Sequence, residues 1–126
     1  MLGIGIDAVD VDRFALLLTR REGLGERLFT ERERADAAGS VSRLAARFAA
    51  KEAAMKALGV GLGAFRFHEV EVVRAPSGQP SLVLAGEAAA TAVERGVTTW
   101  HVSLTHTDGL AVATAIAAWE QRCAST

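Results

Sequence analysis

The chain has 126 residues, half of them hydrophobic, and its 14 basic and 15 acidic side chains leave a formal net charge of -1. This balance argues against nucleic acid as a partner, and no apolar run approaches the roughly 20 residues of a membrane span. One cysteine, Cys123, excludes an intramolecular disulfide and a multi-thiolate metal site. Because the amino terminus lacks the pattern of a signal peptide, we expect one cytoplasmic domain over residues 1–126.

The first predicted element is a short strand at 2–6, in which branched residues alternate with Gly3 and Gly5. Glycine weakens a strand, so these positions indicate the close approach of another backbone or of a ligand. Asp7 follows at the expected carboxyl end of the strand, where ligand sites often form. The same position also suits an ordinary turn or capping carboxylate.

A helix is predicted at 11–21, with a buried stripe of Val11, Phe14, Ala15 and Leu18. Another side of this region carries Arg13, Leu17, Arg20 and, beyond two helix-breaking glycines, Arg27. This edge could receive an acidic partner helix, but the carboxylates interleaved with the arginines favour an ordinary solvated face. Thr30 and Glu33 have the spacing of a capping box that opens a further helix.

The longest predicted helix runs from Ser40, its N-cap, to the residue before Gly59. The only two lysines of the chain, Lys51 and Lys56, lie here beside Glu52, whereas every other basic residue is arginine. Lysine is a compact cation whose pKa is easily adjusted, so this placement suggests a site. A surface pair between Glu52 and Lys56 would leave the same pattern.

The second half of the chain predicts mainly strands. A hairpin is expected at 68–74 and 81–84, an alanine-rich helix at 87–94, and strands at 100–106 and 110–119. The last strand is almost wholly apolar, so we expect it to be central in its sheet. His106 ends the preceding strand, a position more typical of a hydrogen-bonded turn residue than of a catalytic one.

Asp7 and Glu52 are two carboxylates without a histidine or cysteine cluster. Such a pair suits Mg²⁺, which keeps most of its waters and shares its coordination shell with substrate phosphates. Lys56, about 6 Å beyond Glu52 along the helix axis, is placed to neutralise a phosphate on that metal. The glycines at 59, 61 and 63 permit close approach to a ligand, but first indicate a helix cap and loop. The reaction class suggested is phosphoryl transfer.

Three blocks of sequence add a resemblance to these observations. They are residues 3–7 with Arg13 and Phe14, residues 47–53 with Lys56 and Gly59, and residues 101–107. In this order and spacing they resemble the holo-[acyl-carrier-protein] synthase family, the small 4′-phosphopantetheinyl transferases. The resemblance runs from the first predicted strand to the last.

The resemblance implies an α+β fold, the 4′-phosphopantetheinyl transferase fold, with a small antiparallel sheet packed against one long helix and shorter helices. It also implies a homotrimer with active sites between subunits. The implied reaction moves 4′-phosphopantetheine from coenzyme A to a serine of an acidic apo acyl carrier protein. The implied pathway is fatty acid biosynthesis, and carrier proteins of polyketide or peptide synthetases are the alternative substrates.

The same resemblance assigns residues to roles. Asp7 and Glu52 would hold Mg²⁺ on the pyrophosphate of coenzyme A, and Lys56 would contact that phosphate. Coenzyme contacts would come from Arg47, Lys51, Gly59, Gly61, Gly63, His106 and Thr107. Of these, Arg47, His106 and Thr107 would bind the nucleotide end, including its 3′-phosphate, and the glycines would line the adenine side. Carrier docking would use Arg13, Leu17, Arg20 and Arg27. The base that activates the serine is open between Glu52 and a metal-bound water. A coenzyme A-binding regulatory protein is the competing interpretation, against which the intact Asp7, Glu52 and Lys56 argue.

Overall fold

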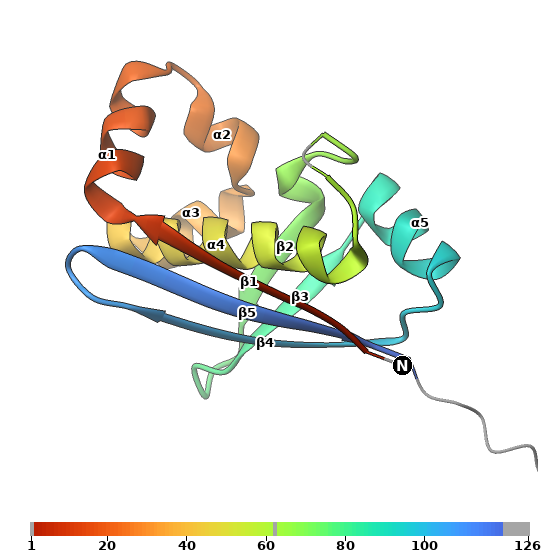
Figure 1. Cartoon of the computed structure of the whole chain (residues 1–126). Helices are drawn as coiled ribbons and strands as arrows, with labels where there is room; N and C mark the ends of the chain where they lie inside the picture. The colour runs from red at the N-terminus through yellow and green to blue at the C-terminus, as the bar shows by residue number, and fades with distance from the viewer. Residues whose placement is uncertain (1, 62, 120–126) are drawn as a thin grey trace, which may run out of the picture.

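A computed structural model describes residues 2–61 and 63–119 and shows a three-stranded antiparallel sheet crossed by one long helix (Figure 1). In spatial order the sheet consists of β1 (Leu2–Asp10), β5 (Leu110–Ala118) and β4 (Thr99–His106). The prediction that the last strand is central is therefore confirmed. A second antiparallel sheet consists of β2 (Val70–Arg74) and β3 (Pro80–Leu84).

The long helix is α4 (Val41–Leu58). The other helices of the described residues are α1 (Val11–Arg20), α2 (Leu24–Leu28), α3 (Glu31–Ala37), the 3₁₀ helix η1 (Phe67–Glu69) and α5 (Gly86–Glu94). The predicted hairpin strand at 68–74 begins later, at Val70, because His68 lies in η1. The expected α+β class, with antiparallel sheets and one long helix, is confirmed. Within the described part of the chain, no helix is both long and apolar enough to cross a membrane.

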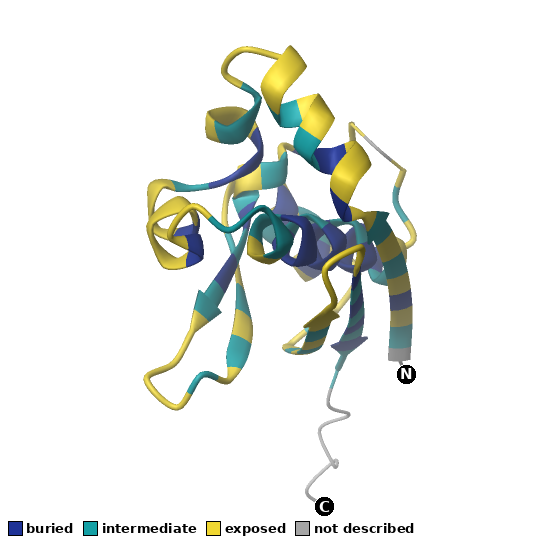
Figure 2. Ribbon diagram, turned by 90° about the vertical axis from the view of Figure 1, so that its left-hand side faces the viewer, coloured by how far each residue is buried: buried dark blue, intermediate teal, exposed yellow. Residues whose placement is uncertain are grey.

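Small residues let α4 lie close against the sheet. The buried face of α4 is lined by Ala45, Ala46, Ala49, Ala50, Ala53 and Ala54, and that of β5 by Ala111, Ala113, Ala115 and Ala117. A Cβ atom on Gly5 would lie 1.8 Å from the carbonyl oxygen of Ala53, and one on Gly3 2.1 Å from that of Ala57. Of the two explanations offered by the sequence, the glycines thus serve the approach of another backbone. Figure 2 shows α4 buried between the sheet and the outer elements.

Strand β1 is longer than the sequence suggested. It pairs with β5 without interruption from Leu2 to Asp10, so Asp7 lies within the strand, opposite Ala113. The expectation that Asp7 ends the strand is therefore wrong, because pairing with β5 extends β1 by four residues. The strand ends where the Asp10 side chain accepts a hydrogen bond from the Arg13 N–H and caps α1.

The helix caps predicted from the sequence are present in the structure. Thr30 and Glu33 form the predicted capping box of α3, Ser40 accepts a hydrogen bond from the Arg43 N–H, and Gly59 ends α4 with a φ of 73°. The helical layer is held by aromatic contacts, in which Phe14 stacks on Phe48 at 5.0 Å between ring centres. These contacts fix α1 beside the amino-terminal half of α4.

Candidate active site

A carboxylate pair and a lysine meet where β1 crosses α4. The Lys56 ammonium group donates to Asp7 Oδ1 at 3.1 Å and to the main-chain oxygen of Ile6 at 3.0 Å. The Asp7 side chain is only 12% exposed, whereas that of Lys56 is 55% exposed. The interpretation of a simple surface pair between Glu52 and Lys56 does not describe this site, since Lys56 pairs with Asp7.

Glu52 shares this site with Asp7. Burial, followed by the neighbouring carboxyl group of Asp7, raises the pKa of Glu52 from 4.5 to about 7, while Lys56 opposes the shift. Asp7 Oδ2 is buried and has no hydrogen-bond donor. Two carboxyl groups that face each other in this way need a shared proton or a cation between them.

The donor set fits a hard divalent cation. Asp7 and Glu52 offer carboxylate oxygens, one of them the unsatisfied Oδ2, and this is the chemistry that Mg²⁺ prefers. Among the described residues, no group of three or more histidine, cysteine or acidic side chains gathers in one place. The remaining coordination positions of such an ion would therefore go to water and phosphate oxygens, as the sequence suggested.

Lys51 has a different environment from its neighbour Lys56. It is 0% exposed, and its ammonium group lies 2.7 Å from Glu33 Oε1. It also donates to the main-chain oxygens of Phe67 and Val70, so all three of its hydrogens have partners. Lys51 therefore joins α4 to α3, η1 and β2, and its geometry does not support the expected contact with coenzyme A.

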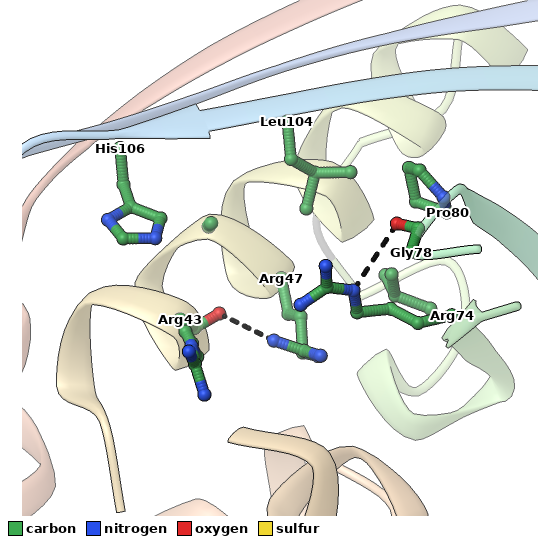
Figure 3. A pocket seen from close by; sticks show the side chains of 9 residues that line it. Arg43, Arg47, Arg74, Gly78, Pro80, Leu104 and His106 are labelled. Atoms are coloured by element: carbon green, nitrogen blue, oxygen red, sulfur yellow. Dashed lines mark hydrogen bonds between the residues drawn. The ribbon is translucent and has the colours of Figure 1, made fainter. Parts of the chain in front are cut away.

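A cationic cavity of about 180 Å³ lies elsewhere on α4. It is lined by Arg43, Ala46, Arg47, Val72, Arg74, Gly78, Pro80, Leu104 and His106 (Figure 3). Arg47 and His106 thus meet in one cavity, whereas Thr107, the third residue expected at the nucleotide end of the coenzyme, does not line it. Arg43 and Arg74 were not among the residues predicted from the sequence. The spacing of Arg43, one helical turn before Arg47, was the available signal for the former.

The cationic cavity and the carboxylate site lie on different sides of α4. Arg47 and Glu52 are five residues apart, which corresponds to about 140° around a helix with 3.6 residues per turn. The lining of the cavity includes neither Asp7 nor Glu52 nor Lys56. Within one chain, the two groups of expected coenzyme contacts therefore do not converge.

The remaining expected coenzyme contacts have varied surroundings. Gly59 borders a second cavity of about 300 Å³ together with Lys56 and Arg95. Gly61 and Gly63 line neither cavity and have open space where a Cβ would be. The Thr107 hydroxyl accepts hydrogen bonds from the N–H groups of Gly109 and Leu110, which closes the turn between β4 and β5.

The expected docking residues share an exposed surface on α1 and α2. These side chains are Arg13, Leu17, Arg20 and Arg27. Leu16, which is 51% exposed, adds a second apolar group beside Leu17, at 43%. Two exposed leucines thus lie among arginines, and only Leu17 was predicted from the sequence.

Comparisons with known proteins identify the class of this fold. The chain matches the model of the 4′-phosphopantetheinyl transferase superfamily over residues 3–115. A holo-[acyl-carrier-protein] synthase of Frankia casuarinae is 50% identical over 117 residues, which are 93% of this chain and 97% of that one. The chain therefore belongs to the 4′-phosphopantetheinyl transferase superfamily.

Solved structures agree with this assignment. The Chronobacterium ammoniagenes ACPS–CoA complex has a TM-score of 0.85 at 28% identity, covering 96% of this chain and 99% of that one. The Helicobacter pylori holo-[acyl-carrier-protein] synthase in complex with coenzyme A has a TM-score of 0.80 at 28% identity, covering 94% and 100%. The family resemblance drawn from the sequence, to the holo-[acyl-carrier-protein] synthases, is confirmed, and the protein is a transferase.

Proposed function

We propose that this protein transfers 4′-phosphopantetheine from coenzyme A to a serine hydroxyl of an apo acyl carrier protein, in a reaction that requires Mg²⁺. The serine oxygen forms a bond to the pantetheine-bearing phosphorus, the pyrophosphate bond breaks, and adenosine 3′,5′-bisphosphate leaves. The observation that carries the proposal is the site of Asp7, Glu52 and Lys56, with its unsatisfied Oδ2. Relatives named for this reaction and neighbours that bind coenzyme A support it.

Each residue of the carboxylate site has a role that follows from its charge. Asp7 and Glu52 would hold Mg²⁺, which when bound neutralises charge on the pyrophosphate. Lys56, exposed and anchored to Asp7 Oδ1, would bind a phosphate oxygen and stabilise the negative charge of the leaving group. These roles need positioning and charge, which is what phosphoryl transfer demands of a protein.

The nucleotide end of coenzyme A belongs, in this proposal, in the cationic cavity with Arg47 and His106. Gly59, Gly61 and Gly63 would line the adenine side, and Thr107 would contribute from the turn after β4. Because the cavity and the carboxylate site lie on different sides of α4, one coenzyme molecule would span the cavity of one subunit and the carboxylates of the next.

The outer face of the sheet supports association with further copies of the chain, and the proposed assembly is a homotrimer. Ile4 and Ile6 on β1 are 64% and 60% exposed, and Ile116 on β5 lies beside Ile4. An apolar sheet face of this kind favours association with another copy. Ile4→Arg should convert the trimer to monomers in sedimentation velocity experiments, and an unchanged sedimentation coefficient would contradict this assembly.

The carrier would dock on the surface formed by α1 and α2. Arginines around Leu16 and Leu17 suit an acidic carrier helix, since positive charge speeds the encounter and apolar contacts stabilise the complex. The pathway proposed for this carrier protein is fatty acid synthesis. Carriers from fatty acid, polyketide and peptide synthases, compared at equal concentration, would rank the preference directly.

Mass spectrometry of an apo acyl carrier protein tests the reaction. Incubation with this protein, coenzyme A and Mg²⁺ should add the mass of one phosphopantetheine, and a chelator should abolish the gain. Glu52→Gln, which removes one metal-ligand charge, should remove activity, whereas Glu94→Gln on the exposed side of α5 should not. Coenzyme A binding without any mass gain on several carriers would favour the non-catalytic regulatory protein instead.

A further inference from the structure

Arg95 lines the second cavity together with Lys56 but has no role in the proposed function. It follows α5, and its Nη1 atom donates to the main-chain oxygen of Leu58, at the end of α4, at 2.7 Å. The residue is exposed, yet none of the ion pairs among the described residues includes it. Arg95 thus joins two helices through a carbonyl group, whereas an ordinary surface arginine faces a carboxylate or water.

The end of α4 requires hydrogen-bond donors from outside the helix. The last four carbonyl groups of an α-helix have no partner within it. In α4, the N–H groups of Gly59 and Val60 donate to two of these carbonyls, and Arg95 donates to that of Leu58. The positive charge of the guanidinium group also stabilises the negative end of the helix dipole. Arg95 therefore holds the last turn of α4 from a segment that is distant in sequence.

This last turn also carries Lys56, which lies two residues before Leu58. A Cβ atom on Gly59 would lie 3.4 Å from Arg95 Nη1, so the guanidinium group lies beside the residue that ends the helix. Lys56, Gly59 and Arg95 border the same cavity of about 300 Å³. A change in the conformation of this turn therefore changes the position of Lys56.

The reach of Lys56 depends on where its main chain is held. Its ammonium group contacts Asp7 Oδ1 and the main-chain oxygen of Ile6. In the proposed reaction the same ammonium group also contacts a phosphate oxygen, which competes with Asp7 for it. A lysine side chain is flexible, and that of Lys56 is 55% exposed, so the last turn of α4 decides where the ammonium group can lie.

We propose that Arg95 is a positioning residue for Lys56, because it holds the last turn of α4 so that the ammonium group stays within reach of the phosphate. The inference rests on the proposed function, which gives Lys56 its phosphate contact. Arg95 acts through the carbonyl group of Leu58 and does not itself touch the substrate. Its removal lets the last turn open, so Lys56 spends less time in the productive position.

Calorimetric titration with coenzyme A and Mg²⁺, without a carrier protein, tests the coupling between the two residues. Arg95→Ala should lower the affinity about fivefold, and Arg95→Lys should restore part of it, because lysine keeps the charge and a donor. Lys56→Met removes the phosphate contact, so Arg95→Ala should cause no further loss in the Lys56→Met background. Arg32→Ala changes an exposed arginine of α3 that lines neither cavity, so this matched control should bind as the wild type does.

Steady-state transfer and hydrogen exchange supply independent readouts. In Arg95→Ala, kcat should fall about tenfold, which corresponds to about 1.4 kcal/mol, while the carrier KM stays constant because the docking surface is unchanged. The amides of Gly59 and Val60 should exchange faster, whereas the Val72 amide, which donates to Glu33 Oε2, should keep its protection. A loss of global stability alone would lower the protection of all three amides equally.

The inference would be overturned by unchanged kcat and affinity in Arg95→Ala, by an equal loss in Arg32→Ala, or by a full further loss of affinity in the Lys56→Met background. An equal fall in the protection of all three amides would assign Arg95 to global stability instead. If the wild type binds coenzyme A but transfers nothing, the proposed function fails, and the affinities and exchange rates still decide the role of Arg95. A wild type that does not bind coenzyme A would overturn both.

Discussion

The buried pair of Glu33 and Lys51 leads to a quantitative prediction about stability. Both side chains are 0% exposed, and Lys51 Nζ lies 5.6 Å from the ring centre of Phe29 in addition to its three hydrogen-bond acceptors. Lys51→Met keeps most of the side-chain volume but removes the charge and every donor. The carboxylate of Glu33 then stays buried with only the N–H groups of Thr30 and Val72 as partners.

The expected loss is large because an uncompensated charge stays inside the protein. Removing one partner of a buried ion pair typically costs about 3–5 kcal/mol. The two remaining N–H donors place Lys51→Met near the lower end, at about 3 kcal/mol, which corresponds to roughly 10 °C in Tm for a chain of this size. Glu33→Gln combined with Lys51→Met should lose less than the sum of the single changes, because no unpaired charge is left.

Urea denaturation at one fixed protein concentration measures these losses. Lys56→Met is the matched control, and at 55% exposure its ion pair should contribute less than about 1 kcal/mol. Where Lys51→Met is still folded, it should bind adenosine 3′,5′-bisphosphate as the wild type does. Near-normal stability together with lost nucleotide affinity would refute this reasoning and restore Lys51 as a coenzyme contact.

The contact between β1 and α4 leaves no room at Gly5, where a Cβ would lie 1.8 Å from the carbonyl oxygen of Ala53. Gly5→Ala should therefore destabilise the folded protein by about 3 kcal/mol or prevent folding. A normal urea midpoint would contradict this. Because the pKa of Glu52 is raised to about 7, the folded metal-free protein binds more protons than the unfolded chain above pH 4.5. With a chelator present, the free energy of unfolding of the wild type should therefore fall as pH rises to about 7, relative to that of Glu52→Gln. A pH-independent difference between the two proteins would be evidence against the raised pKa. On the docking surface, Arg20→Ala should raise the carrier KM more than it lowers kcat, with a smaller effect at high salt. A carrier KM that does not respond to salt would exclude electrostatic docking.

Local signals in the sequence determined most of the secondary structure. Caps at Thr30, Ser40 and Gly59 follow from short-range hydrogen bonding and backbone conformation, and all three are present in the structure. The apolar composition of the last strand placed it at the centre of the sheet, since only a central strand is covered in that way. The three blocks of motif residues were sufficient to indicate the family, because their order and spacing do not depend on packing.

Tertiary structure decided which residues meet. Lys51 and Lys56 are five residues apart and hence about 140° apart around α4, so the sequence placed them on different faces. It did not show which face is buried, because alanines surround the helix on most sides. Two elements outside α4 decide this: α3 supplies Glu33, which pairs with the buried Lys51, and β1 supplies Asp7, which pairs with the exposed Lys56. Contacts between distant segments likewise place Arg74 beside Arg47, since local spacing holds no information about them.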